Sequence, residues 1–332
     1  PAGFCPFLFF MNTPVAKLGL DLKMLAPGFH RRRFQARDVG FDAWIWRGGP
    51  GPTLLLNGAT HGDEYEGPTL LRQWAETWRP VHLRGTVVMV PVLNEGAFFA
   101  GQRCHPGDSG NLARAFPGSA RGSVTARLAH LFDTQLLAQA SHYVDLHSGG
   151  GAYELLPWVG YLTRDDAIGR TQRAMAACFD SFWCWAGPFL PGRTLSAAHA
   201  RNIPAIYAEC RGAGGLEDRD LQALQRGLEN LLQWAGCVAG PGRALRRQKT
   251  RTAGDAQEAH LQVHHPAPLD GLFVSTAKLG QRVRKGQALG FVHGLGSAKK
   301  VPVKAERTGR IVLVRYQRSV RKGDALFTLA PI

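Results

Sequence analysis

Two histidines and one glutamate, placed where two predicted strands end, could together hold a metal ion. His61 and Glu64 occur in His-Gly-Asp-Glu, shortly after the apolar run 53–57, and His147 follows the apolar run 143–146. A hydrolytic zinc ion needs three protein ligands and one open position for water, and two histidines with one glutamate are a recurrent ligand set. His-x-x-Glu alone is also found in solvated loops, so the prediction of a metal site depends on all three residues.

Two acidic residues near the same strand ends could assist this site. Asp145 lies two residues before His147, on the same side of the predicted strand, so we expect it to orient that imidazole. Glu209 follows the apolar run 203–208. A carboxylate there could take a proton from the attacking water and pass it to the leaving amine. The alternative is structural, with Glu209 in a salt bridge to Arg211 or to another arginine.

Arginines supply the remaining candidates. Arg103 and Arg114 lie in the Gly- and Pro-rich segment 101–118. Guanidinium groups on such a loop can bind a carboxylate through two hydrogen bonds or polarise a scissile carbonyl, whereas in a solvated loop they would do neither. Spacing does not distinguish four further arginines that could line the same pocket: Arg47, Arg193, Arg201 and Arg211.

Short apolar strands and amphipathic helices alternate along the chain and would position these residues. The pattern predicts strands over 53–57, 87–91, 143–146 and 203–208, and helices over 68–78, 124–139 and 217–234. Such alternation indicates an α/β fold with a largely parallel sheet. Ligands of these sheets bind at the carboxyl ends of the strands, where His61, His147 and Glu209 are expected.

Composition narrows the class of protein. The 332 residues are 45% hydrophobic and 20% charged, which is typical of a globular chain. No apolar stretch is long enough to span a membrane. The apolar run 4–10 is not preceded by the basic residues that begin a signal sequence. Met11 is a plausible native start. The six cysteines form no Cys-x-x-Cys pair, which predicts reduced thiols in a cytoplasmic protein.

Charge divides the chain into two parts. Residues 243–332 carry 18 Lys and Arg against five Asp and Glu, whereas the preceding residues carry 22 against 20. Within the basic part, Val283-Arg-Lys-Gly-Gln-Ala-Leu289 recurs as Val320-Arg-Lys-Gly-Asp-Ala-Leu326. This repeat, with a glycine turn in each copy, predicts an all-β barrel or sandwich of two related halves. We expect domains over 11–240 and 261–332, joined by a linker over 241–260.

The series of motifs resembles the succinylglutamate desuccinylase/aspartoacylase family, which is itself similar to the zinc carboxypeptidases. The resemblance covers roughly residues 20–332. It is carried by three stretches: Asn57-Gly-Ala-Thr-His-Gly-Asp-Glu-Tyr-Glu-Gly67, Arg103 with Asn111-Leu-Ala-Arg-Ala-Phe-Pro-Gly118, and Asp145-Leu-His-Ser-Gly-Gly150. It implies an α/β domain with a carboxypeptidase-like mixed sheet flanked by helices, followed by a biotinyl/lipoyl-like β module.

The resemblance also implies a function. The family's members are zinc amidohydrolases that remove an N-acyl group from an amino acid, and the subgroup that includes N-acetyl-diaminobutyrate deacetylases of ectoine breakdown looks closest. Matched motif by motif, the roles are one Zn²⁺ held by His61, Glu64 and His147, Glu209 as general base, Arg103 polarising the carbonyl and, with Asn111 and Arg114, binding substrate. The family usually has Asn-Leu-Asn-Arg where this chain has Ala113, so the substrate is less certain than the reaction.

Alternatives remain at this point. A metallocarboxypeptidase that trims small peptides would use the same metal site. The basic C-terminal part could bind nucleic acid, but no basic stretch is interleaved with aromatic residues, so no nucleic-acid partner is expected. Lys299 and Lys300 occupy the region where biotinyl modules carry their modified lysine, but no methionine flanks them, so we expect no prosthetic group. The expected partner is a small N-acyl amino acid, without a membrane partner, and self-association into a homo-oligomer stays open.

Overall fold

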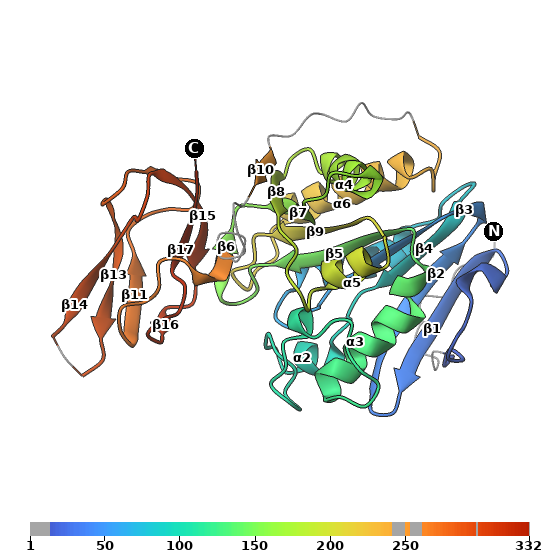
Figure 1. The fold of residues 1–332 in the computed structure, drawn as a ribbon, viewed down its shortest axis with the longest axis horizontal. Coiled ribbons are helices and arrows are strands. Elements are labelled where there is room, and N and C mark those ends of the chain that lie inside the picture. The colour runs from blue at the N-terminus through green and yellow to red at the C-terminus, as the bar shows by residue number, and fades with distance from the viewer. Residues whose placement is uncertain (1–13, 241–249, 253–260, 297, 332) are drawn as a thin grey trace.

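The computed structural model describes residues 14–240, 250–252, 261–296 and 298–331. The larger part, here called the body, is a sheet covered by helices, and the smaller part, here called the tail, is all-β (Figure 1). Met11 lies outside the described residues, as do 241–249 and 253–260 of the predicted linker. The residues between those two gaps form strand β10 (Thr250–Thr252), which pairs with the body's sheet.

In the described residues, the body is built on one mixed sheet of nine strands. Side by side they are β1 (Gly28–Ala36), β2 (Val39–Arg47), β4 (Arg84–Val90), β3 (Gly49–Asn57), β5 (His142–Ser148), β9 (Ala205–Cys210), β7 (Trp158–Leu162), β8 (Trp183–Gly187) and β10. Strands β4, β3, β5 and β9 are parallel neighbours. The predicted α/β fold is confirmed, and the sheet is mixed because the pairs β1–β2, β2–β4 and β7–β9 are antiparallel.

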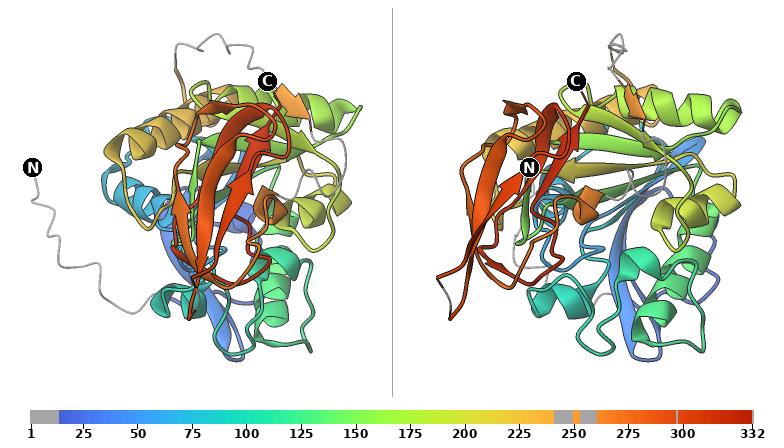
Figure 2. Two further views of the ribbon diagram at one scale, coloured as in Figure 1. Left: turned by 90° about the vertical axis from the view of Figure 1, so that its left-hand side faces the viewer. Right: turned by 60° about the vertical axis from the view of Figure 1, so that its left-hand side comes forward.

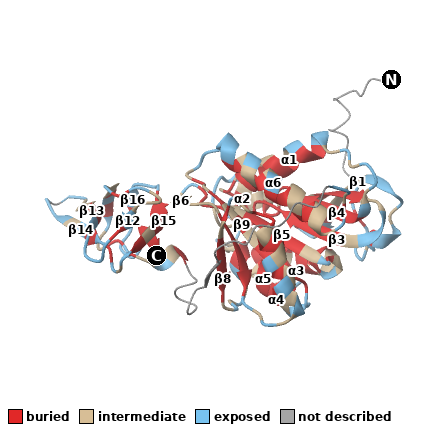
Figure 3. Ribbon diagram, turned by 90° about the horizontal axis from the view of Figure 1, so that it is seen from above, coloured by how far each residue is buried: buried red, intermediate tan, exposed pale blue. Residues whose placement is uncertain are grey.

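Both faces of this sheet are buried. Leu54 and Leu56 of β3 belong to one apolar cluster and Leu55 to another, because successive side chains of a strand point to opposite faces. Each such leucine contributes about 1.5–3 kcal/mol to folding by leaving water. Figure 3 shows the buried residues concentrated in the strands and on the inner sides of the helices.

Helices α1, α4 and α6 contribute to the first cluster, and α3 and α5 to the second. The helices are α1 (Glu66–Thr77), α2 (Glu95–Phe99), α3 (Val124–Gln135), α4 (Ala167–Ala177), α5 (Thr194–Ala200) and α6 (Asp218–Trp234). Single 3-10 turns cover Leu22–Met24, Leu112–Arg114, Leu137–Gln139 and Leu261–Val263. The predicted helices over 68–78, 124–139 and 217–234 correspond to α1, to α3 with the turn after it, and to α6. No helix in the described part of the chain is long and apolar enough to span a bilayer.

The tail consists of two sheets around a common apolar core. One contains β14 (Lys300–Lys304), β13 (Ala288–Gly294), β11 (Gly271–Ser275) and β16 (Ser319–Val320), and the other β12 (Arg282–Val283), β15 (Gly309–Arg315) and β17 (Phe327–Ala330). Phe273 of the first sheet and Phe327 of the second meet in this core, with ring centroids 5.5 Å apart. The prediction of a β-rich C-terminal region is confirmed, while its likeness to biotinyl or lipoyl modules stays a prediction.

The two copies of the sequence repeat occupy corresponding places in the tail. Each copy begins at a buried valine, Val283 or Val320, that ends a short strand. Gly286 and Gly323 have φ values of +81° and +95°, a backbone conformation that glycine adopts without steric cost. After each glycine comes a side chain, Gln287 or Asp324, that accepts a hydrogen bond from the backbone N–H three residues earlier. The repeat therefore encodes the same turn twice.

A strand of the body joins the second sheet of the tail. Strand β6 (Tyr153–Leu155) pairs antiparallel with β15, so that Leu155 lies opposite Leu313. Trp158 and Trp185 of the body and Val312 of the tail belong to one buried cluster at this junction. The views in Figure 2 show the tail packed beside one end of the body's sheet. Tail and body therefore share both a backbone ladder and an apolar core.

Candidate active site

His61, Glu64 and His147 converge at the carboxyl ends of β3 and β5. One potential ligand atom from each of these three side chains lies within 4.8 Å of those of the other two. The Nδ1 atom of His61 is 2.7 Å from Glu64 Oε1, and the Nδ1 atom of His147 is 2.8 Å from Glu64 Oε2. All three side chains are largely buried, at 10% exposure or less. The structure thus brings together the residues that the sequence singled out.

The outer nitrogen of each imidazole has its own acceptor. His61 Nε2 lies 3.1 Å from Asn111 Oδ1, and His147 Nε2 lies 2.9 Å from Asp145 Oδ2. These acceptors favour a proton on Nε2 and leave both Nδ1 atoms facing the shared centre, as in histidines that bind a metal. Two imidazoles and a carboxylate on one centre fit a divalent ion such as zinc. The expected contact between Asp145 and His147 is present.

Asp145 is itself held by a buried network. Its Oδ1 accepts hydrogen bonds from Asn57 and Thr60, at 3.0 and 2.8 Å, and its Oδ2 accepts one from the Thr194 hydroxyl, at 2.6 Å. Because Asn57 ends β3 and Thr194 begins α5, the network ties these two elements and the loop of Thr60 to the strand that carries His147. A fully buried carboxylate with this many donors remains ionised, and these bonds together with His147 outweigh burial and lower its pKa.

Burial and neighbouring charges both shift the pKa values of the three clustered side chains, and the balance between them differs from one side chain to the next. Burial and the positive charge of Arg103 lower the pKa of His61 to about 4, so this imidazole is neutral at pH 7. Burial would raise the pKa of Glu64, but the two histidines hold it well below its ordinary value. Burial would also lower the pKa of His147, but Asp145 and Glu64 raise it well above its ordinary value. Glu64 is therefore an anion at neutral pH.

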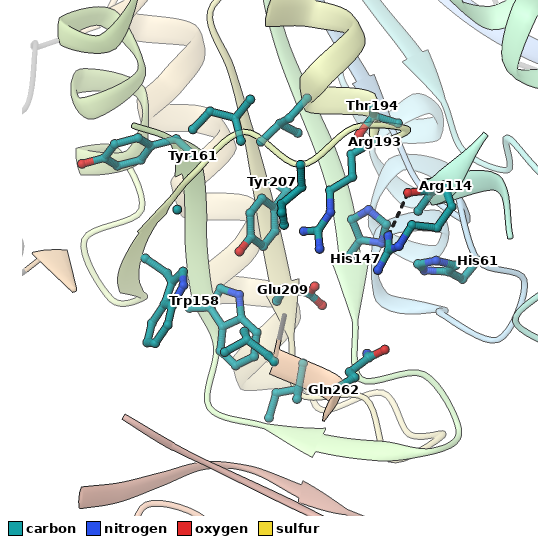
Figure 4. A pocket seen from close by; sticks show the side chains of 18 of the residues that line it. His61, Arg114, His147, Trp158, Tyr161, Arg193, Thr194, Tyr207, Glu209 and Gln262 are labelled. Carbon is teal, nitrogen blue, oxygen red and sulfur yellow. Dashed lines mark hydrogen bonds between the residues drawn. The ribbon is translucent and has the colours of Figure 1, made fainter. Parts of the chain in front are cut away.

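Glu209 ends β9, the strand next to β5, and its Cα is directly opposite that of His147. Its Oε2 atom is buried and has no hydrogen-bond partner within the described ranges. Arg211, the suggested salt-bridge partner, instead binds Glu154 at 2.7 Å and Asp220 at 3.2 Å. Burial raises the pKa of Glu209 to about 8. This carboxylate is thus free of a structural ion pair with Arg211 and faces the pocket beside His147 (Figure 4).

Three arginines line the same pocket. Arg103 Nη1 is 3.2 Å from Glu64 Oε1, at the edge of the histidine cluster. Figure 4 shows the side chains of Arg114 and Arg193 extending toward His147 and Glu209. Burial, with the positive charges of Arg193 and Arg103, lowers the pKa of Arg114 to about 10. The pocket is therefore electropositive where it approaches the histidines.

Arg114 and Arg193 are positioned by two loops that touch. The N–H of Phe116 donates to the Gly192 carbonyl at 2.9 Å. Gly192 has a φ of +81°, and a Cβ atom there would meet the Arg114 carbonyl oxygen at 2.5 Å, so glycine is required for this approach. The loop of Arg114 is also anchored by Asp108, which accepts from the N–H and hydroxyl of Thr125 on α3.

The remaining arginine candidates lie elsewhere. Arg47 donates to the carbonyls of Gly48 and Gly49, and Arg201 binds the buried Asp133. Of the four arginines that spacing could not distinguish, the structure places Arg193 at the pocket. Asn111 is not among the described lining residues: its Oδ1 also accepts the N–H of Ala113 at 2.9 Å, in addition to its contact with His61. Its predicted contact with substrate stays a prediction.

The rest of the pocket wall is apolar, and the sequence did not indicate it. Strands β7, β8 and β9 contribute aromatic rings, the loop before α5 and its first turn contribute aliphatic side chains, and the tail adds Leu261, Gln262 and Leu313. Figure 4 shows Trp158 and Tyr161 on the side of Tyr207 away from the histidines. Periodicity marks such residues only as core, because it cannot tell an apolar wall from a packed interior.

The chain is similar in sequence to known enzymes. Residues 50–235, more than half of the chain, match the model of the succinylglutamate desuccinylase/aspartoacylase catalytic domain. The chain is 32% identical over 290 residues to the N-alpha-acetyl-L-2,4-diaminobutyric acid deacetylase of Halomonas elongata, covering 86% of this chain and 83% of that protein. The matched region contains His61, Glu64, His147 and Glu209.

Solved structures extend the likeness to the tail. A succinylglutamate desuccinylase from Silicibacter sp. is similar with a TM-score of 0.83 and 26% identity, over 97% of this chain and 99% of that one. The product-bound ectoine utilization protein EutE (DoeB) of Ruegeria pomeroyi is similar with a TM-score of 0.82 and 29% identity, over 97% and 100%. Coverage of this extent includes both body and tail.

Proposed function

The chain belongs to the succinylglutamate desuccinylase/aspartoacylase family, and on that premise we propose that it is a zinc-dependent deacylase that hydrolyses the amide bond of an N-acyl amino acid. The observation that carries the proposal is the convergence of His61, Glu64 and His147 beside Glu209, whose buried Oε2 has no hydrogen-bond partner in the described part of the chain. The substrate class is that of the similar enzyme from Halomonas elongata, whose name specifies an acetylated amino acid.

His61, Glu64 and His147 would hold one zinc ion through two Nδ1 atoms and a carboxylate. When bound, zinc would polarise the amide carbonyl and make a water molecule more acidic. Asn111 and Asp145 would keep each imidazole oriented from behind, since each accepts a hydrogen bond from an Nε2 atom. In this proposal Asn111 positions a ligand, in addition to any contact with substrate.

Glu209 would act as the general base and then as the general acid. Its Oε2 takes a proton from the water that attacks the carbonyl carbon, and the carboxyl group then gives that proton to the nitrogen of the departing amine. A pKa raised by burial suits both steps, because the group must accept and release a proton near neutral pH. A carboxylate already bound to an arginine would be a weaker base.

The three arginines would divide two tasks between them. Arg103, which lies next to Glu64, would donate to the oxygen of the scissile carbonyl as negative charge develops there. Arg114 and Arg193, which line the same pocket, would bind the substrate carboxylate. Arg193 then supplies a charged donor in a chain whose Ala113 lacks the amide that is usual in the family motif.

The first test replaces Glu209 with glutamine, which keeps the shape of the side chain and removes the base. We expect Glu209→Gln to bind zinc stoichiometrically and to lose about 10²–10⁴-fold in kcat on N-acyl amino acids, measured by mass spectrometry of metal content and by amine release. Glu76→Gln, an exposed change on α1, is the matched control and should retain full activity. Full activity in Glu209→Gln would contradict the assignment.

The same assay separates deacylation from peptide trimming. Short peptides with free carboxyl termini are offered beside N-acetyl, N-succinyl and N-formyl amino acids. Faster turnover of the peptides would favour the metallocarboxypeptidase alternative.

We further propose that the catalytic unit spans 11–240 and the β module spans 261–332, with 241–260 between them.

A further inference from the structure

The pocket has an apolar compartment that the proposed chemistry does not use. It is lined by Trp158, Tyr161, Trp185, Leu190, Leu195 and Leu313. Five of these six side chains are less than 10% exposed, and Leu190 is half-buried. They come from β7, β8, the loop before α5, the first turn of α5 and β15 of the tail. Aromatic and aliphatic side chains from five separate segments thus line one pocket.

The charges in the pocket are unevenly distributed. Glu209 is the only carboxylic acid among the described residues that line it, and this group is assigned to proton transfer. Arg103, Arg114 and Arg193 line it as well, and their charges act on one another. A substrate ammonium group would therefore meet three guanidinium groups and no carboxylate that is free to pair with it. An aromatic wall can attract a cation, but not readily next to three fixed positive charges.

We propose that this enzyme prefers N-acyl amino acids that carry a large apolar group next to the scissile amide; the inference rests on the proposed deacylase function. With the carbonyl at the histidine cluster and the carboxylate at Arg114 and Arg193, the remaining arm of the substrate extends toward Trp158, Tyr161 and Trp185. The arm is aromatic or branched aliphatic, because only such a group gains by leaving water for this wall. It is either the amino-acid side chain or the acyl chain.

A substrate panel tests the preference and distinguishes the two arms. Zinc-loaded protein is assayed for kcat/KM on N-acetyl-L-phenylalanine, N-phenylacetylglycine, N-acetylglycine and Nα-acetyl-L-2,4-diaminobutyrate. We expect one of the first two to exceed both of the last two by at least tenfold. Preference for N-acetyl-L-phenylalanine assigns the compartment to the side chain, and preference for N-phenylacetylglycine assigns it to the acyl group. Equal rates, or the highest rate on the diaminobutyrate compound, would overturn the inference while leaving the deacylase function intact.

Binding provides a second readout that does not depend on turnover. Calorimetry on the zinc-free protein should show tighter binding of N-acetyl-L-phenylalanine or N-phenylacetylglycine than of N-acetylglycine, by at least tenfold in Kd. This binding without hydrolysis by the zinc-loaded protein would preserve the inference and overturn the proposed function. Absence of both binding and hydrolysis would overturn the two together.

A charge placed in the compartment should reverse the preference. Leu190→Glu adds a carboxylate from a half-buried loop position and should lower kcat/KM for the preferred apolar substrate at least tenfold, while raising it for Nα-acetyl-L-2,4-diaminobutyrate. Phe189→Glu is the matched control, because Phe189 is 50% exposed and is not part of the lining. The ratio of kcat/KM for the apolar substrate to kcat/KM for Nα-acetyl-L-2,4-diaminobutyrate measures the preference, and an unchanged ratio in Leu190→Glu would overturn the inference. If melting shows that this variant is unfolded, Leu190→Ala should lower the same ratio about threefold.

Discussion

The two sides of the pocket are built on different principles. On the histidine side the clustered side chains and their acceptors are held by neighbours: Glu64 bridges two imidazoles, and Asp145 accepts bonds from residues of three segments. On the opposite side, Leu190 and Leu195 provide shape through aliphatic side chains that form no hydrogen bonds. Hydrogen-bonded groups tolerate little change, whereas an apolar wall can be rebuilt residue by residue. In the proposed function, the histidine side would determine the reaction and the apolar side would select the substrate.

The largest expected effect comes from breaking the histidine side directly. His61→Ala removes one of the three ligands, so we expect tight zinc binding and hydrolysis to be abolished, as treatment of the native protein with a chelator should also do. Metal content measured by mass spectrometry after dialysis checks this. Replacement by alanine of the exposed His82, which is not among the described lining residues of the pocket, should leave one zinc per chain. An unchanged metal content in His61→Ala would contradict the ligand set.

A smaller effect is expected from Asp145, which contacts the outer nitrogen of His147. Asp145→Asn keeps the shape of the side chain but weakens the hold on His147, so zinc affinity should fall about 10–100-fold. Competition with a fluorescent chelator measures this affinity, and thermal melting shows whether the fold persists. Thr194→Val removes one donor to Asp145 without touching the histidine and should lower zinc affinity less. Equal affinities in Asp145→Asn and the native protein would show that His147 needs no outer acceptor.

At the boundary between the two sides, Arg193 should affect substrate binding more than chemistry. Arg193→Ala removes a charged donor to the substrate carboxylate, a contact worth about 1.5–3 kcal/mol, so kcat/KM should fall at least about tenfold, mainly through KM. Zinc content should not change. Arg170→Ala, on the exposed face of α4, is the matched control. A fall in kcat with unchanged KM would instead assign Arg193 to the transition state.

The smallest effect is expected where this chain departs from the family motif. Ala113 is buried and lines the pocket, so Ala113→Asn restores an amide at the price of tighter packing. We expect kcat/KM to change less than tenfold, with a gain for small substrates such as N-acetylglycine relative to those with large arms. The ratio of the two rates measures the shift. An increase in kcat/KM for the large substrates alone would contradict this expectation and show that the asparagine side chain does not narrow the pocket.

Local patterns in the sequence predicted the histidine side well. His61, His147 and Glu209 each follow an apolar strand, and ends of neighbouring parallel strands must meet, so their convergence could be foreseen. Glu64 follows from its spacing to His61. The motif that contains Arg103 and Arg114 was recognisable because both stand in one loop. The same reasoning predicted the central strands and the helices α1, α3 and α6.

The apolar side could not be predicted in this way. Trp158 and Trp185 lie in short strands that were not foreseen, and their apolar side chains are indistinguishable in sequence from core residues. Arg193 has no regular spacing to the other site residues; its position depends on contact between two loops through Gly192. Leu313 reaches the pocket only because the tail docks on the body. The edge hairpin of β1 and β2 was missed too, since β1 is rich in arginine and resembles a solvated segment.

The pairing of β6 with β15 has a consequence for how enzymes of this architecture can diversify. Only four residues separate the end of β5, just after His147, from the strand that the tail extends. A foreign C-terminal module grafted at the linker would disturb the segment behind the histidine unless β6 and its ladder partner were transplanted together. We therefore expect that such modules can be exchanged only as a set with their docking strand, and that chimaeras joined at the linker alone are inactive.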